Sequence, residues 1–186
     1  SLHHLMKIVS GVPNPRPPWY FDIAQQGNAL ADIGTHLVDR VHGTLFPETA
    51  LDPAADIAVT AVRRWPTMID LAQFRQVTGE TGWPAYLGDA VAGGTLAYLC
   101  NTHLDYAVRG IHVGLDMVWE WLEPAGGGDT HTEIWRGSRA RIELRHGPDE
   151  GWRGELYVVP PADIRRSEER SGGKGGRSRW RPHHQK

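Results

Sequence analysis

The chain has 186 residues and a formal net charge of −2, and its apolar fraction of 40% and charged fraction of 23% are those of an ordinary globular protein. This length predicts one domain, or one domain with a small appendage. No apolar stretch approaches the length of a membrane span, and the single cysteine, Cys100, excludes an internal disulfide while leaving the redox compartment open.

The N-terminal residues already have the pattern of folded sequence. Residues 1–11, SLHHLMKIVSG, carry apolar side chains at spacings that suit a short helix ended by Gly11. Residues 12–22, VPNPRPPWYFD, contain four prolines, which exclude a helix and predict an extended connector. The connector ends in three adjacent aromatic residues, Trp19, Tyr20 and Phe21.

Residues 27–45 are predicted to form an amphipathic helix that ends near Pro47. One side of its helical wheel is apolar and holds Leu30, Ile33, Leu37, Val41 and Leu45. The opposite side holds Asp32, His36 and Asp39. The simplest interpretation of these three is a solvent-exposed helix face. A histidine one turn after an aspartate can also be held in one tautomer and made more basic, which favours a catalytic face.

The middle of the chain alternates between strand and helix patterns. Residues 56–67 predict a strand that starts at Ile57. Residues 68–79 predict a short helix with Asp70 as its N-cap and Gly79 as its stop. Residues 81–95 are rich in glycine and proline, and we expect a loop with one helical turn at most.

The clearest strand pattern covers residues 104–122, which we expect to form one long strand. Apolar side chains alternate on one of its faces, at Ile111, Val113, Leu115, Met117, Trp119 and Trp121. The other face holds His112, Gly114, Asp116, Val118 and Glu120. That second face is expected to be a solvated or interface surface, or else a wall of a substrate cleft.

Residues 130–147 predict a hairpin that turns through RGSR at 136–139, and residues 155–160 predict one more short strand. In the second arm of the hairpin, Ala140, Ile142 and Leu144 are expected to face one way, and Arg139, Arg141, Glu143 and Arg145 the other. The order of elements predicts an α+β fold, with a mainly antiparallel, open-faced sheet and helices packed on one face.

These residues carry a resemblance to a known family. The stretch WYFDIAQQGNALADIGTHLVDRVHGTLFP contains an Asp-x-Gly-x-His-x-x-Asp helix at Asp32, Gly34, His36 and Asp39. It resembles the C-terminal domain of the Gfo/Idh/MocA oxidoreductases, in the branch called putative oxidoreductase C-terminal domains. The likeness continues through RRWPT, FRQVTGE, RGIHVGLDMVWEW, PAGGGDTH and WRGS to ELYVVP, and so covers residues 2–160.

The resemblance implies one half of a two-domain enzyme. In the family a Rossmann domain binds NAD or NADP, and the α+β half supplies the substrate face and most of the oligomer interface. Asp32 and His36 would then lie at the reacting carbon of a sugar, polyol or related hydroxylated compound, where they would take the hydroxyl proton. The fingerprint G-x-G-x-x-G between a strand and a helix has no counterpart here, so we expect the Rossmann half to be absent from this chain.

Further residues are expected to line the substrate cleft: Trp19, Tyr20, Gln26, Asp39, His112 and His131. No metal site is expected, because His112, Asp116 and Glu120 lie too far apart along one strand to share an ion. The alternative function is a non-catalytic binding or oligomerisation module that uses the open sheet face. For either function we expect a small-molecule ligand or a second copy of the chain as partner, and no membrane.

The C-terminal residues differ in composition from the rest. Residues 164–186 hold eight of the 20 Lys and Arg and only two acids, and they are rich in glycine. We therefore expect a globular domain over 1–163 and a disordered basic tail over 164–186. Phosphate binding by the tail is the less favoured interpretation, because a lone Trp180 makes no base-stacking surface. A cytoplasmic location is favoured and export is left open, because the chain starts at Ser1 and the true N-terminus is expected to be missing.

Overall fold

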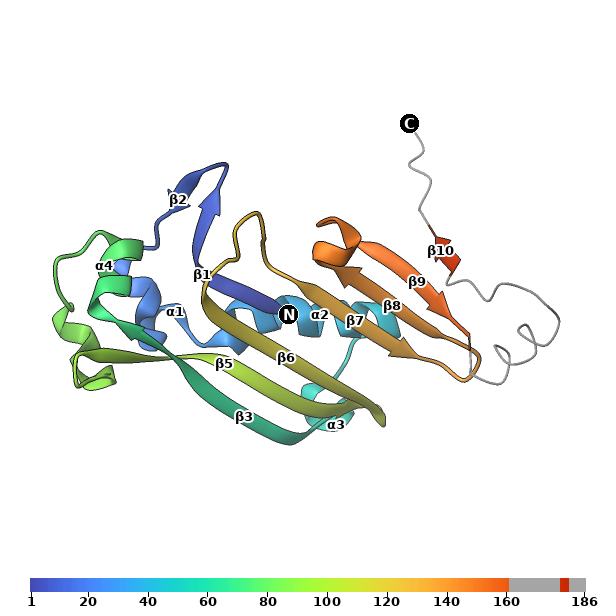
Figure 1. The fold of residues 1–186 in the computed structure, drawn as a ribbon. Coiled ribbons are helices and arrows are strands. Elements are labelled where there is room, and N and C mark those ends of the chain that lie inside the picture. Colours follow the sequence, from blue (N-terminus) through green and yellow to red (C-terminus); the bar gives the residue numbers. More distant parts are fainter. Residues whose placement is uncertain (161–177, 181–186) are drawn as a thin grey trace. The chain divides into compact units, whose positions relative to one another are not determined.

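The computed structural model describes residues 1–160 and 178–180 (Figure 1), and the chain divides into two compact units. The first unit comprises residues 2–123, and the second begins at Pro124. Each unit has its own sheet. The boundary between the units therefore lies inside the stretch 1–163 that we expected to form one domain.

The sheet of the first unit has six strands. They are β1 (Leu2–Val9), β2 (Val12–Asn14), β3 (Ile57–Asp70), β4 (Val91–Ala92), β5 (Thr95–Val108) and β6 (Ile111–Leu122). The order is β2-β1-β6-β5-β3, and β4 pairs with the start of β5. β1 runs parallel to β6, and the remaining pairs are antiparallel.

The prediction of a helix at the N-terminus is wrong, because these residues form the strand β1. Its neighbours Leu5 and Met6, which point to opposite faces of a strand, are both buried, with exposed fractions of 0% and 2%. Ser10 and Gly11 then form a two-residue turn with φ of 53° and 81°, and β2 pairs back onto β1. A short apolar run suits a buried strand as well as a helix, and pairing with β6 decides between them here.

The single long strand expected over residues 104–122 is also wrong. The chain turns back at Arg109 and Gly110, with φ of 47° and 79°, and this turn joins β5 to β6. Asp56 holds the turn, because it accepts from Nε of Arg109 at 2.9 Å. The predicted alternation is confirmed within β6, where Val113, Leu115, Met117 and Trp119 are buried and the side chains between them are exposed or half-buried.

The prediction for β3 and the helix after it is confirmed in outline. β3 starts at Ile57 as expected and continues to Asp70, past Pro66. A register shift beside Pro66 and the position of β3 at the sheet edge both make the proline tolerable. The helix α4 (Leu71–Thr78) begins at a capping box formed by Asp70 and Gln73, and it ends at Gly79 with φ of 77°.

The other helical elements of the first unit are short. They are η1 (Pro18–Phe21), α1 (Ile23–Gln26), the π-helix η2 (Leu30–Gly34), α2 (Thr35–Leu45), α3 (Pro53–Asp56) and η3 (Ala85–Ala90), and η3 is the helical turn expected in the loop. α1 and α2 lie behind the sheet in Figure 1, so among the described residues no helix of this unit covers the opposite face of β5 and β6. This arrangement confirms the predicted α+β fold.

An aromatic cluster fixes the helical side of the core. Phe21 of η1 lies 5.4 Å from Phe74 of α4 and 5.3 Å from Tyr98 of β5, measured between ring centroids. Phe21 and Phe74 are almost completely buried. Edge-to-face aromatic packing of this kind holds the end of the proline-rich connector against the sheet, and the chain then enters the segment with Asp32 and His36.

The second unit contains a four-stranded antiparallel sheet in the order β10-β9-β8-β7. Its strands are β7 (His131–Arg136), β8 (Arg141–His146), β9 (Glu155–Val159) and β10 (Ser178–Trp180), and η4 (Pro148–Glu150) follows β8. The predicted hairpin and the short strand after it are confirmed. The prediction of a disordered tail over 164–186 does not hold for residues 178–180, because the main chain of β10 pairs with β9. The other residues of that predicted tail lie outside the described ones.

Candidate functional site

The segment with the Asp-x-Gly-x-His pattern begins with a π-helical turn. η2 spans Leu30–Gly34 and runs directly into α2, so the expected continuous α-helix is interrupted at Asp32. π-turns are rare, and within helices they occur frequently at functional sites. Asp32 is half-buried in this turn, and His36 is exposed in the first turn of α2.

Gly34 allows this helix to lie close to the sheet. A Cβ atom at Gly34 would be 2.9 Å from Sδ of Met117 on β6 and 3.2 Å from the backbone oxygen of Ala29. Glycine is therefore needed at this position for close packing. Residues two places before and after a helical position project from nearly the opposite side, so Asp32 and His36 point away from this contact.

A buried tyrosine holds Asp32. The hydroxyl group of Tyr20 donates to Oδ2 of Asp32 at 3.3 Å. The Tyr20 side chain is 7% exposed, and burial raises its pKa far above the usual value, so the hydroxyl stays a neutral donor. Arg16 covers the ring, with Cζ 4.5 Å from its centroid, and Tyr98 donates to the backbone oxygen of Tyr20 at 3.0 Å. The connector thus fixes the position of the Asp32 carboxylate.

Four of the six predicted cleft residues lie between residues 19 and 39, on η1, α1 and α2. Trp19 in η1 is 45% exposed, and Gln26 at the end of α1 is half-buried. Asp39 lies one turn after His36 on α2 and is exposed. Tyr20 differs from these three residues because it is buried. Its burial and its hydrogen bond to Asp32 suit a positioning role better than contact with a substrate.

The two other predicted histidines lie elsewhere. His112 is on β6, on the strand face opposite to Met117, and its Nε2 lies 3.4 Å from Oδ1 of Asp105. His131 is on β7 in the second unit, where its Nε2 lies 2.6 Å from Oε1 of Glu133. The structure therefore does not bring His112 to the segment of Asp32, and His131 belongs to the other unit.

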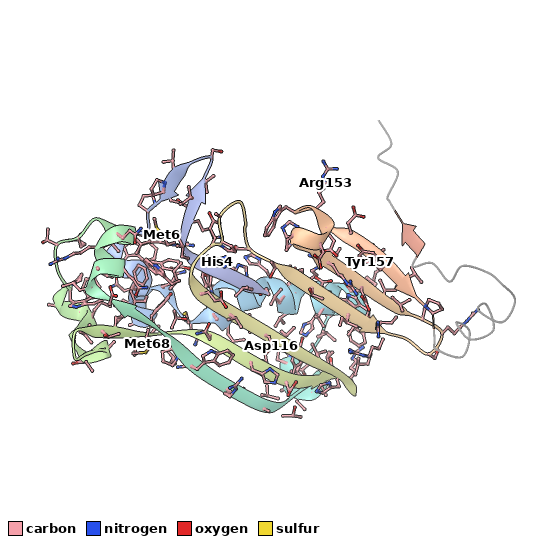
Figure 2. All side chains as sticks on the ribbon, viewed as in Figure 1. His4, Met6, Met68, Asp116, Arg153 and Tyr157 are labelled. Atoms are coloured by element: carbon pink, nitrogen blue, oxygen red, sulfur yellow. The ribbon has the colours of Figure 1, made fainter. Side chains whose placement is uncertain are left out.

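A charged network on the open sheet face was not predicted. His103 of β5 has Nδ1 2.8 Å from Oδ1 of Asp116 and Nε2 3.0 Å from Oδ2 of Asp105. Figure 2 shows Asp116 on β6. Only a doubly protonated imidazole can donate from both nitrogens, so this geometry favours the imidazolium. The hydrogen bonds to the two carboxylates raise the pKa of His103, and the bond to Asp116 contributes more than the bond to Asp105.

The stability of the first unit is expected to depend on pH through His103. Because the folded pKa lies above that of a free imidazole, about 6.5, the stabilisation is fully present below about pH 6.5 and is lost as the pH rises through the folded pKa. An NMR titration of the His103 ring measures that pKa. His103→Gln should remove this part of the pH dependence of unfolding, and an imidazole that titrates at or below the free value contradicts the prediction.

The described residues offer little for a metal or a dinucleotide. Within residues 1–160 and 178–180, no group of three His, Cys, Asp or Glu side chains could hold a metal ion. The glycines at 126–128 lie between the strands β6 and β7, so they do not open a helix as a phosphate-binding turn does. No helix in this part of the chain is long and apolar enough to cross a membrane.

An open, mainly antiparallel sheet with helices on one face, and an Asp-x-Gly-x-His helix packed on it, define an α+β domain. The chain belongs to the family described as putative oxidoreductase C terminal domain, which matches residues 1–173. This match confirms the resemblance to putative oxidoreductase C-terminal domains.

One solved structure is similar over nearly the whole chain. It is a crystal structure of a putative oxidoreductase from Parabacteroides merdae ATCC 43184, with a TM-score of 0.87 and 33% sequence identity. The alignment covers 98% of this chain and 46% of that chain, so the present chain spans about half the length of its relative. No curated protein matches the chain significantly.

Proposed function

We propose that this chain is the substrate-binding half of an NAD(P)-dependent oxidoreductase of the Gfo/Idh/MocA type, acting on a sugar, polyol or related hydroxylated compound. Membership of an oxidoreductase family supports the reaction class. The observation that carries the proposal is the π-turn of η2, which carries Asp32 bonded to a buried tyrosine and leads directly to the exposed His36.

His36 is assigned the proton transfer. Oxidation of an alcohol requires removal of the hydroxyl proton, and an imidazole is the side chain best suited to accept it near neutral pH. His36 is exposed and follows Asp32 by four residues, so both project from one side of the helix. Asp32 supports the imidazole and the substrate hydroxyl electrostatically, and Asp39 extends the same polar face.

The described residues do not fit a dinucleotide, and we assign them no part in holding the cofactor, NAD or NADP. The glycine-rich stretch at 126–128 joins two strands, so it lacks the helix N-terminus that binds a pyrophosphate. Calorimetric titration of residues 1–186 with NADH and NADPH is therefore expected to show no appreciable binding. A dissociation constant in the micromolar range contradicts this expectation.

The full-length protein provides the test of the reaction. We expect reduction of NAD or NADP, measured by absorbance, with at least one member of a panel of sugars and polyols. The same panel with a variant of Asp32 or His36 distinguishes turnover at this segment from turnover elsewhere. Full activity of both variants contradicts the assignment of these residues, and no activity toward any hydroxylated compound contradicts the substrate class.

The free sheet face supports a second role, self-association. On β3 the guanidinium of Arg63 lies 4.4 Å from the ring of Trp65, and Met68 at the same strand is 55% exposed and labelled in Figure 2. A broad open sheet is a natural self-complementary surface. Sedimentation velocity is expected to show a homo-oligomer that Met68→Glu weakens. A strict monomer at high micromolar concentration contradicts this role.

A further inference from the structure

A pocket of about 480 Å³ lies on one face of the sheet in the second unit. This volume is in the range of small-molecule sites, about 300–1,000 Å³. The side chains that line it include Thr132 and Ile134 of β7, Arg141, Glu143 and Arg145 of β8, and Glu150 of η4. The strand pairing places Ile134, Glu143 and Tyr157 next to one another, and Figure 2 shows Tyr157 on β9.

A buried carboxylate forms the floor of this pocket. The Glu143 side chain is 3% exposed and is bonded by Arg141 at 2.5 Å and by Arg145. Burial by itself raises the pKa of Glu143, but the hydrogen bonds from Arg145 and Arg141 outweigh it and lower the pKa. Glu143 is therefore a fixed anion. The prediction that Glu143 shares a strand face with Arg141 and Arg145 is confirmed, because all three are paired in one β8 register and both arginines are bonded to Glu143.

The two arginines keep unused hydrogen-bonding capacity. A guanidinium has five N–H donors, and Glu143 can accept only some of those that Arg141 and Arg145 offer. Nε of Arg141 is buried and has no hydrogen-bond partner. The Arg141 and Arg145 side chains remain 42% and 30% exposed, so further N–H groups are accessible beside the carboxylate.

The loop that closes one end of the pocket is strained. Gly151 and Trp152 are both in the left-handed region, with φ of 62° and 60°, and the second is a bulky residue that rarely adopts it. The backbone N–H of Trp152 donates to the oxygen of Gly147 at 2.9 Å and holds the turn. Strain of this kind is found preferentially at binding sites. Within this loop Glu150 is 9% exposed and lies 3.4 Å from the hydroxyl group of Tyr157.

We infer that this pocket binds an uncharged, polyhydroxylated ligand, such as one monosaccharide unit. Its donors and acceptors stand side by side, as sugar hydroxyl groups require, and the 43% exposed Ile134 offers an apolar surface to the C–H face of a ring. An anion is disfavoured, because the two arginines share the pocket with three carboxylates, those of Glu143, Asp149 and Glu150, and so leave no net positive charge for it. The site is assigned independently of Asp32 and His36, which belong to the other unit.

Amide NMR spectra of the full chain titrated with D-glucose, D-galactose and myo-inositol test the inference. We expect saturable shifts at the amides of Ile134 and Gly147, with a dissociation constant in the millimolar range for at least one compound. Arg141→Met should weaken that binding at least tenfold. Arg153→Met is the matched control and should bind as the parent chain does. Arg153 is exposed and lies outside the pocket, in the loop between η4 and β9 (Figure 2).

A second variant keeps the test independent of folding. Thr132→Val removes one hydroxyl group from the pocket wall at nearly constant shape, and it should also weaken binding. It replaces Arg141→Met in the test if that variant does not give the spectrum of a folded protein. Absence of shifts with all three compounds overturns the inference. So does unchanged binding by the folded variants, and so do shifts that arise only with phosphate or citrate.

Discussion

Replacing His36 with alanine in the full-length protein is expected to lower turnover by about two to four orders of magnitude, the usual contribution of a positioned general base. Because His36 is exposed, the free energy of unfolding should change by less than about 0.5 kcal/mol. Steady-state kinetics with a compound identified from the sugar and polyol panel measures the first effect, and urea unfolding measures the second.

His42 provides the matched control on the same helix. Its Nε2 lies within hydrogen-bond distance, 3.3 Å, of the hydroxyl group of Tyr106, and burial raises the pKa of Tyr106 to about 12, so the phenol keeps its proton. His42→Ala should therefore reduce stability slightly and leave turnover within a few-fold of the parent. If His36→Ala is fully active, or if both variants lose activity equally, the assignment of His36 as the base is wrong.

The sequence alone predicts the polar face of this helix but not the contacts that shape it. Periodicity placed Asp32, His36 and Asp39 on one side, and the structure agrees that the side packed on the sheet is the one with Gly34 and Val41. The hydrogen bond from Tyr20 to Asp32 depends on how the aromatic cluster packs, and no local pattern encodes it. No local pattern encodes the π-turn either, because Leu30, Ala31, Asp32 and Ile33 have ordinary helix propensities.

The errors in the sheet have two causes. At the N-terminus a short apolar run suits a helix and a buried strand equally well, and only strand pairing decides between them. At Arg109 and Gly110 the buried positions change from even to odd numbers, because Val108 pairs with Ile111 across the two-residue turn, and the single-strand prediction overlooked this change of phase. Placing the turn there would have paired His103 with Asp116 and predicted the charged network, because register follows from turn length.

Glu143 shows a different limit. Its alternation with Ile142 and Leu144 was predicted correctly, but a charged side chain on a strand is expected to be the exposed one. In the structure Glu143 is buried and Ile142 is 40% exposed. Two arginines, each two residues away, reverse the usual preference because they neutralise the carboxylate and bond to it.

Replacing Gly34 with alanine is expected to affect both folding and catalysis. The added methyl group would lie 2.9 Å from Sδ of Met117 and 3.2 Å from the backbone oxygen of Ala29, and overpacking of this kind costs about 1–3 kcal/mol. The same contact forces η2 away from β6 and moves Asp32 and His36 with it. A displacement of about 1 Å at a catalytic group can cost about a hundredfold in rate, so turnover should fall by one to two orders of magnitude.

A double-mutant cycle with Met117→Ala separates crowding from helix propensity. Met117→Ala removes the sulfur that the new methyl group would meet, so Gly34→Ala should cost much less in that background. The contact with the backbone oxygen of Ala29 at 3.2 Å remains in that background, and the better helix propensity of alanine, about 1 kcal/mol relative to glycine, offsets part of its cost. Urea unfolding of the four proteins measures the coupling energy. A cost that is the same in both backgrounds would show that the helix does not depend on Gly34 for its approach to the sheet, and the position of Asp32 and His36 would then need another explanation.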